Sequence, residues 1–221
     1  MENIFNNKYH RYLDLPFEIK PHPMFSESPK NPIHLDTIDW EQSEMTEWLG
    51  SLGCVVQHTE VFYTAPGTTI PIHADNMFID NHVKINLTFG PKEGKVIWWK
   101  SDSPFGFTAK SANEYADAMV QKEYGDERVK EAVEGWTNRP ENTNVVLPQL
   151  KDCTKVWEAN TNKPSLLNVG QLHSTWCPDT EGRWTICFVP AIITKQQQEW
   201  IQWYDALEVF KDYIVEEETV G

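Results

Sequence analysis

Apolar positions gather in short runs through two separate stretches of the chain, residues 54–99 and 155–189. The runs are rich in β-branched and aromatic residues, and turns containing proline and glycine lie between several of them. The pattern predicts eight short strands, at 54–63, 68–75, 83–89, 96–99, 155–158, 165–169, 171–176 and 183–189. Strands in this number, flanked by helices, predict an α+β domain whose mainly β core is a sandwich or barrel.

Other segments show the spacing of helices. Residues 36–50 carry apolar side chains at helical intervals and end at a glycine. A capping box at Ser111 and Glu114 opens a helical pattern within residues 101–152, which predicts an insertion between the fourth and fifth barrel strands that covers the open barrel end. A second capping box, at Thr194 and Gln197, predicts a C-terminal helix over 194–215.

The chain has the size of a single large domain covering residues 1–221. Five prolines exclude a long regular element from residues 1–34, so residues 1–50 are expected to form an arm followed by a helix. The barrel strands are then expected in residues 51–100 and 153–190.

The formal net charge of −14 disfavours binding to the phosphate backbone of a nucleic acid. Four cysteines without a CxxC pair indicate reduced thiols and not a disulfide scaffold. Residues 1–20 lack the basic start and apolar run of a secretion signal, and no apolar run is long enough to span a membrane. We therefore expect a cytoplasmic protein without nucleic-acid or membrane partners.

The strongest candidate for chemistry is the pair His73 and Asp75. Residues two apart on a strand share a face with their Cα atoms roughly 6.5 to 7 Å apart, which allows an imidazole and a carboxylate to bind one cation. An H-x-D pair is common by chance, so it is weak alone. His173 adds a third ligand, a hundred residues later, within another predicted strand.

Two imidazoles and one carboxylate on one face leave three positions open on an octahedral metal, as in non-haem Fe(II) oxygenases. Zinc hydrolases use similar ligands, usually around a four-coordinate metal. Arg183 follows His173 by ten residues and begins an apolar strand. A guanidinium is costly in such a place unless it is paired, and it binds carboxylates through two parallel hydrogen bonds.

This order of H-x-D, a long gap, His and then Arg is similar to that of the Fe(II)/2-oxoglutarate-dependent dioxygenases. The Tyr…Pro-Gly…His-x-Asp-Asn opening, residues 63–76, looks most like their prolyl-hydroxylase branch. The resemblance implies a double-stranded β-helix, a jelly-roll or cupin-like barrel with flanking helices. It also implies that His73 and Asp75 on the second barrel strand and His173 on the seventh ligate Fe(II).

The same resemblance implies a cosubstrate site. Arg183 on the eighth strand would bind the distal carboxylate of 2-oxoglutarate, and Thr185 shares its face. Tyr63 matches a tyrosine that contacts the cosubstrate in some prolyl hydroxylases. The implied activity is O₂-dependent hydroxylation of a small-molecule or peptide substrate, such as a peptidyl or amino-acid side chain, with ascorbate as a candidate reductant.

Three other interpretations stay open. A cupin-like metal-binding protein without oxygenase activity, or a zinc or manganese isomerase or hydrolase, could use the same three ligands, but neither has a reason to place Arg183 beside the metal. Cys153, His173 and Cys177 could form a zinc site, although a fourth ligand is not evident. The remaining histidines have no ligand-like spacing and are expected to be surface or structural residues: His10, His22, His34, His58 and His82.

Overall fold

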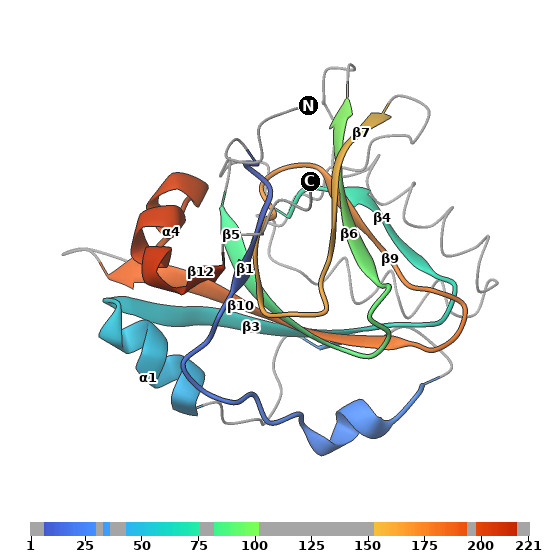
Figure 1. The fold of residues 1–221 in the computed structure, drawn as a ribbon, viewed down its shortest axis with the longest axis horizontal. Coiled ribbons are helices and arrows are strands. Elements are labelled where there is room, and N and C mark those ends of the chain that lie inside the picture. Colours follow the sequence, from blue (N-terminus) through green and yellow to red (C-terminus); the bar gives the residue numbers. More distant parts are fainter. Residues whose placement is uncertain are drawn as a thin grey trace.

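The computed structural model describes residues 7–29, 33–35, 43–75, 82–101, 153–193 and 198–215. Strands dominate this part of the chain and form two sheets, with few helices (Figure 1). The prediction of a mainly β core is confirmed. Residues 102–152 of the predicted insertion, the first part of the helix predicted at 36–50 and the capping box at 194–197 lie outside the described residues.

The larger sheet has eight strands in the order β12-β1-β8-β5-β10-β3-β2, with β11 also paired to β10. Its strands are β1 (His10–Leu13), β2 (Ile33–Leu35), β3 (Cys54–Thr64), β5 (Val83–Phe89), β8 (Ser165–Asn168), β10 (Arg183–Ile193), β11 (Gln198–Trp200) and β12 (Ile214–Val215). The smaller sheet has the order β4-β9-β6-β7. Its strands are β4 (Thr69–His73), β6 (Lys95–Ser101), β7 (Cys153–Asn160) and β9 (His173–Trp176). All eight predicted strands are present; β7 and β10 are longer than predicted, and β4 and β9 are shorter.

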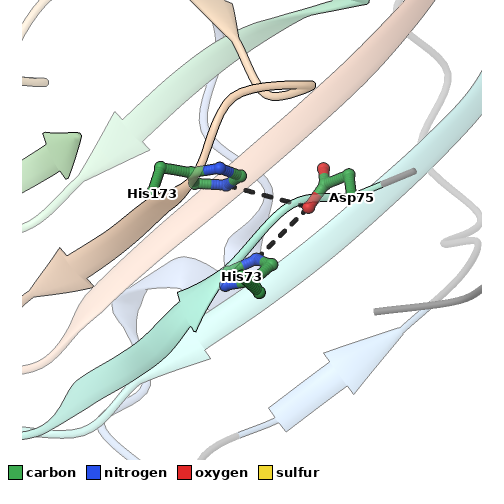
Figure 2. A group of neighbouring side chains, drawn as sticks. All are labelled: His73, Asp75 and His173. Atoms are coloured by element: carbon green, nitrogen blue, oxygen red, sulfur yellow. Dashed lines mark ion pairs between the residues drawn. The ribbon is translucent and has the colours of Figure 1, made fainter. Parts of the chain in front are cut away.

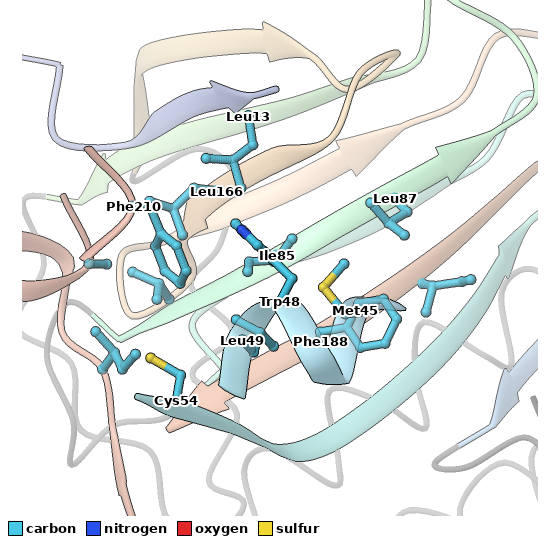
Figure 3. Close-up of a cluster of buried hydrophobic side chains, with 14 of the residues drawn as sticks. Leu13, Met45, Trp48, Leu49, Cys54, Ile85, Leu87, Leu166, Phe188 and Phe210 are labelled. Atoms are coloured by element: carbon cyan, nitrogen blue, oxygen red, sulfur yellow. The ribbon is translucent and has the colours of Figure 1, made fainter. Parts of the chain in front are cut away.

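The hydrophobic core lies on the outer face of the larger sheet. Helix α1 (Ser43–Ser51) places Met45, Trp48 and Leu49 against this face, and Figure 3 shows them beside Ile85. All four side chains are buried. In β5 the apolar residues of the core alternate with polar ones, because successive side chains of a strand point to opposite faces.

The inner face of the larger sheet is turned toward the smaller sheet. Val96 and Trp98 of β6 pack with Leu167 of β8, and the Trp98 Nε1–H donates a hydrogen bond of 3.0 Å to the carbonyl of Asn168. Much of the remaining inner face is polar. The side chains between the two sheets therefore differ in kind from the apolar core outside.

The structure adds detail to one predicted segment and corrects another. Residues 1–34 were expected to be an extended arm without a long regular element, and within this arm His10–Leu13 forms the short strand β1 between β8 and β12, followed by a 3₁₀ turn, η2 (Pro23–Ser26). The edge of the four-residue strand β8 explains why β1 forms, because the backbone groups of β8 need hydrogen-bond partners when they are buried. A short segment can satisfy them even in a proline-rich region.

The C-terminal helix predicted at 194–215 is wrong in extent. Gln198–Trp200 forms β11, and helix α4 covers only Trp203–Val209 before the turn η4 (Lys211–Tyr213) and strand β12. β10 runs beyond the end of β5, and β11 pairs with residues 191–193 of this extension. Tertiary pairing thus overrides the helical spacing of the apolar residues. No described helix has the length and apolar content needed to cross a membrane.

Candidate metal centre

The side chains of His73, Asp75 and His173 meet between the two sheets (Figure 2). The Oδ1 atom of Asp75 lies 3.2 Å from Nε2 of His73 and 3.7 Å from Nε2 of His173. Two ligand atoms at right angles on a metal with bonds of about 2.1 Å would be about 3 Å apart. The spacing in the protein is therefore close to that of a metal-bound set.

The pairing of two strands brings these side chains together. β4 and β9 are antiparallel neighbours, and His73 lies directly opposite His173 in their register. The chain leaves β4 after His73, so Asp75 lies just beyond the strand, where its N–H donates a hydrogen bond of 3.1 Å to the carbonyl of Val169. Asp75 was predicted to be within the strand, and the shared direction of the two side chains persists although the strand ends earlier.

A hydrogen bond orients the ring of His173. Its Nδ1 lies 2.9 Å from the carbonyl oxygen of Gln171, which can only accept, so Nδ1 must carry the proton. This tautomer leaves the lone pair of Nε2 directed toward Asp75, the arrangement commonly found for histidine ligands of metals.

The ionisation states also suit a cation. Burial and the neighbouring His73 lower the pKa of His173 to about 3, against the pull of Asp75, so its imidazole is neutral at physiological pH. Burial alone would raise the pKa of Asp75, but Lys84 and the two histidines lower it well below its usual range. A neutral imidazole and an ionised carboxylate are the forms that bind metals.

Lys84 and Glu60 form a buried ion-pair chain behind Asp75. Nζ of Lys84 lies 2.6 Å from Oδ2 of Asp75 and also pairs with Glu60. Glu60 lies on the inner face of β3, opposite Cys187 of β10. Burial alone would raise the pKa of Glu60, and the attraction of Lys84 is the main reason that it falls to about 2. Burial alone would lower the pKa of Lys84, but Asp75 and Glu60 raise it. All three groups are therefore charged.

Arg183 lies deeper between the sheets and is only 2% exposed. Its Nη1 donates a hydrogen bond of 3.2 Å to Oγ1 of Thr161, and no described carboxylate pairs with it. Gly94 makes room for the guanidinium, since a Cβ atom at Gly94 would be 2.8 Å from Nη1. A guanidinium has five N–H donors, so a buried one with a single described hydroxyl partner can donate further hydrogen bonds to a ligand.

Other polar atoms on the inner face also lack hydrogen-bond partners among the described residues. They belong to the side chains of Asn86, Thr88 and Thr185, and to Nε of Arg183. Thr185 lies opposite Thr88, and Asn86 opposite Cys187, in the pairing of β5 with β10, so these groups share one face. We call these four residues, Asn86, Thr88, Thr185 and Arg183, the inner polar row. Because a buried polar group without a partner is costly, the inner polar row fits a polar ligand that lies along this face.

Tyr63 lies on the other face of the sheet. It pairs with Trp184, and their ring centroids are 4.9 Å apart within the outer hydrophobic core. Since neighbouring side chains of a strand point to opposite faces, Tyr63 points away from Arg183 and Thr185. The structure therefore brings His73, Asp75 and His173 together, places Arg183 and Thr185 on the inner face of β10, and places Tyr63 on the outer face of the sheet.

The alternative zinc ligands are not assembled. Among the described residues, neither Cys153 nor Cys177 joins a group of three potential ligand side chains, and the Cys177 thiol donates to the carbonyl of Glu181. The other histidines whose side chains are described have structural contacts. Nε2 of His10 lies 3.2 Å from the Ser165 hydroxyl, and the His58 ring lies 3.5 Å from Glu60.

Three residues near the candidate ligands were not predicted from the sequence: Lys84, Glu60 and Asn86. A usable signal was present in the segment Val83–Phe89, where every second residue is polar. Because its apolar residues must face the core, Lys84 and Asn86 had to point into the space that holds the metal ligands. Glu60 had no comparable signal, since its position depends on the register of β3 against β10.

No model of a known protein family matches the chain, and no curated protein matches its sequence. Solved structures with a similar arrangement include AviO1 from Streptomyces viridochromogenes Tue57, at 13% identity and a TM-score of 0.37 over 84% of this chain and 74% of that protein. HygX from Streptomyces hygroscopicus, solved with nickel and 2-oxoglutarate bound, has 10% identity and a TM-score of 0.38 over 80% and 81%. HygX with iron bound has 9% identity and a TM-score of 0.37 over 77% and 81%. Likeness at this level identifies no family, so the function has to be argued from the chain's own residues.

Proposed function

We propose that this protein is a non-haem Fe(II) oxygenase that couples oxidative decarboxylation of 2-oxoglutarate to hydroxylation of a substrate. His73, Asp75 and His173 hold the metal in this proposal, and the two sheets form a double-stranded β-helix. The strand orders support such a barrel, because successive strands from β3 to β10 change sheet at every step except from β6 to β7, which pair with each other in the smaller sheet.

The observation that carries the proposal is the position of Arg183. It is a buried cation without a described acidic partner, on the face of the larger sheet that also carries Glu60 and Lys84, whose ion pairs lead to Asp75. Lys84 is the other cation on this face, but Asp75 and Glu60 already neutralise its charge. Arg183 is therefore the group free to bind a carboxylate from a ligand, which favours a dicarboxylate cosubstrate between it and the metal.

The chain's own residues fit this cosubstrate. The guanidinium of Arg183 would bind the distal carboxylate, and the hydroxyls of Thr185 and Thr88 can donate hydrogen bonds to ligand oxygens along the way. The bound iron would supply the activation of O₂, and the protein would orient the reactants and exclude water. The apolar residues outside the sheet take no part in this chemistry.

The rival interpretations explain less of this arrangement. A cupin-like metal-binding protein, or a zinc or manganese isomerase or hydrolase, accounts for the three ligands but leaves Arg183 and the inner polar row without a purpose. The outward position of Tyr63 removes one residue on which the prolyl-hydroxylase resemblance depended. We therefore propose the wider 2-oxoglutarate oxygenase family and keep a peptidyl or amino-acid side chain as one substrate class among others.

The test is a titration of 2-oxoglutarate into anaerobic Fe(II)-loaded protein, followed by the metal-to-ligand charge-transfer absorbance. Arg183→Ala should retain iron and bind 2-oxoglutarate roughly thirty- to a thousandfold more weakly, corresponding to about 2 to 4 kcal/mol for a buried charged partner. Arg183→Lys should recover only part of the affinity, because an ammonium cannot make two parallel bonds.

Arg11 offers a matched control. It donates to the carbonyls of Asn7 and His10 near the surface, so Arg11→Ala should leave the titration unchanged. His73→Ala should lose iron itself. Equal affinity in wild type and Arg183→Ala would exclude the dicarboxylate site and favour a metal-binding barrel without oxygenase activity.

A further inference from the structure

A line of ionisable side chains leads from the edge of the larger sheet to the candidate metal centre. His58 and Glu60 of β3 are 3.5 Å apart, Glu60 pairs with Lys84 of β5, and Lys84 pairs with Asp75. The side chains of Glu60 and Lys84 are 13% and 9% exposed. Two opposite charges at this depth are costly to bury, so a role beyond stability has to be considered.

The two oxygens of Asp75 have different partners. Oδ1 faces the Nε2 atoms of His73 and His173, whereas Oδ2 lies 2.6 Å from Nζ of Lys84. A carboxylate can bind a metal through one oxygen or both. With Oδ2 held by Lys84, only Oδ1 is directed at the site.

The backbone holds Lys84 more firmly than Asp75. Lys84 belongs to β5, which is hydrogen-bonded on both sides, to β8 and to β10. Asp75 follows the end of β4 and lies in no strand. The carboxylate of Asp75 therefore depends on side-chain contacts for its orientation, and the central strand supplies one through Lys84.

We propose that Lys84, supported by Glu60, is a positioning residue that makes Asp75 a one-oxygen metal ligand. This inference rests on the proposed function. One-oxygen binding by Asp75 keeps three positions of an octahedral metal free for the cosubstrate and O₂. Two-oxygen binding would occupy one of them.

In this proposal, Glu60 neutralises the positive charge of Lys84. A lone ammonium beside the ligand would repel a divalent cation, whereas the pair of Lys84 and Glu60 carries no net charge. The pair can therefore orient Asp75 without weakening metal binding electrostatically. Removal of both charges together, in Lys84→Met/Glu60→Gln, keeps the net charge of the site and isolates the loss of orientation.

The experiment measures water-proton relaxation of the Mn(II)-loaded protein, which reports how many exchangeable waters remain on the metal. Wild type should hold about three waters, as expected for three protein ligands on an octahedral ion. Lys84→Met/Glu60→Gln should hold about two, because Asp75 would then bind through both oxygens. A purely structural role for the pair would change stability and leave this number unchanged.

The surface pair of Lys95 and Glu158 provides the matched control. Its atoms lie 2.8 Å apart, and it is far more exposed than the buried pair. Lys95→Met/Glu158→Gln removes the same two charges and should retain three waters. If the buried double variant also retains three, the positioning role is wrong. If wild type binds no Mn(II), the metal site itself fails and this inference with it.

A second measurement needs no variant, in case the double substitution prevents folding. The infrared difference spectrum of wild type on Mn(II) binding separates one-oxygen from two-oxygen carboxylate coordination by the splitting of the two stretching bands. With all aspartates isotopically labelled, Asp75 is identified as the aspartate whose bands change on Mn(II) binding, and a wide splitting is expected for it. A narrow splitting, typical of two-oxygen coordination, would overturn the proposal.

Discussion

Burial controls the charge of individual residues in this protein, and it acts in opposite directions at different places. His10 and His173 are buried without an acidic partner strong enough to keep a proton, so both remain neutral. Asp75, Glu60 and Lys84 are equally enclosed but stay charged, because each lies beside an opposite charge. The interior therefore holds neutral bases and ionised acids side by side, as a metal site requires.

The low pKa of His10 predicts an acid-sensitive fold. Burial, with a smaller effect of Arg11, lowers this pKa to about 3, whereas the unfolded chain titrates near 6.5. Below that pH the unfolded state gains a proton that the folded state refuses, so stability falls as pH falls. His10→Gln should remove about 1.4 kcal/mol of the loss between pH 7.5 and 5.5, measured by urea unfolding of the metal-free protein.

The control for this prediction is Ser165→Ala. The Ser165 hydroxyl lies 3.2 Å from Nε2 of His10, so its replacement removes this hydrogen bond but keeps the buried imidazole, and the acid dependence should remain. His173 contributes a similar dependence, which both variants retain. An unchanged pH dependence in His10→Gln would mean that His10 is not neutral in the folded protein.

Single strands in this fold serve two environments at once. β5 shows this most clearly, because Val83, Ile85 and Leu87 face the outer core, whereas Lys84 and Asn86 face the site. The strand is buried on both sides, yet only one side is apolar. The alternation of apolar and polar residues in β5 therefore reflects one face in the hydrophobic core and one face toward the candidate site, and neither face in solvent.

Substitutions at adjacent positions of β5 should separate these two environments. Ile85 is fully buried in the core, so Ile85→Ala should lower the free energy of unfolding by roughly 2 to 4 kcal/mol and leave the affinity for 2-oxoglutarate unchanged. Asn86→Ala should cost little stability and weaken 2-oxoglutarate binding about tenfold, because it removes one hydrogen bond that the side-chain N–H of Asn86 can donate to a ligand oxygen. Urea unfolding and the anaerobic titration measure the two effects.

The two variants act as controls for each other. A loss of 2-oxoglutarate affinity in Ile85→Ala, or a large loss of stability in Asn86→Ala with normal binding, would contradict the assignment of the two faces. Either result would also weaken the case for a ligand along the inner polar row.

At the scale of the whole molecule, the candidate site joins the two sheets. His73 and His173 come from the smaller sheet, and Lys84 and Arg183 from the larger one. Arg183 also reaches Thr161, which follows β7 of the smaller sheet. A ligand held by both sheets should therefore strengthen their association.

Metal binding is expected to raise the thermal unfolding midpoint. At a free metal concentration of 100 times Kd, the folded state gains about 2.7 kcal/mol, or roughly 5 to 10 °C for a chain of this size. 2-Oxoglutarate should add a further increase only when metal is present. Differential scanning calorimetry with and without a chelator measures both steps.

Arg183→Ala should keep the increase caused by metal and lose the one caused by 2-oxoglutarate. His173→Ala should lose both. A midpoint that is the same with and without metal in wild type would show that the three side chains do not form a metal site in the folded protein.

The sequence by itself determined the features that depend on local pattern and on residue chemistry. The eight strands follow from runs of β-branched and aromatic residues, and His73 and Asp75 share a direction because strand geometry requires it. Arg183 could be singled out because a guanidinium that begins an apolar strand needs a partner. None of these inferences requires knowledge of which strands are neighbours.

Only the tertiary structure decided the features that depend on which strands pair and in what register. Tyr63 is placed outside the site because it pairs with Trp184, and Glu60 is placed inside because it pairs with Cys187. β1 and β11 exist because the edges of β8 and β10 needed hydrogen-bond partners, although the local sequence favoured an arm and a helix. A register shift of one residue reverses the face of every side chain on a strand, so the membership of the site was settled by pairing between distant segments and not by the residues alone.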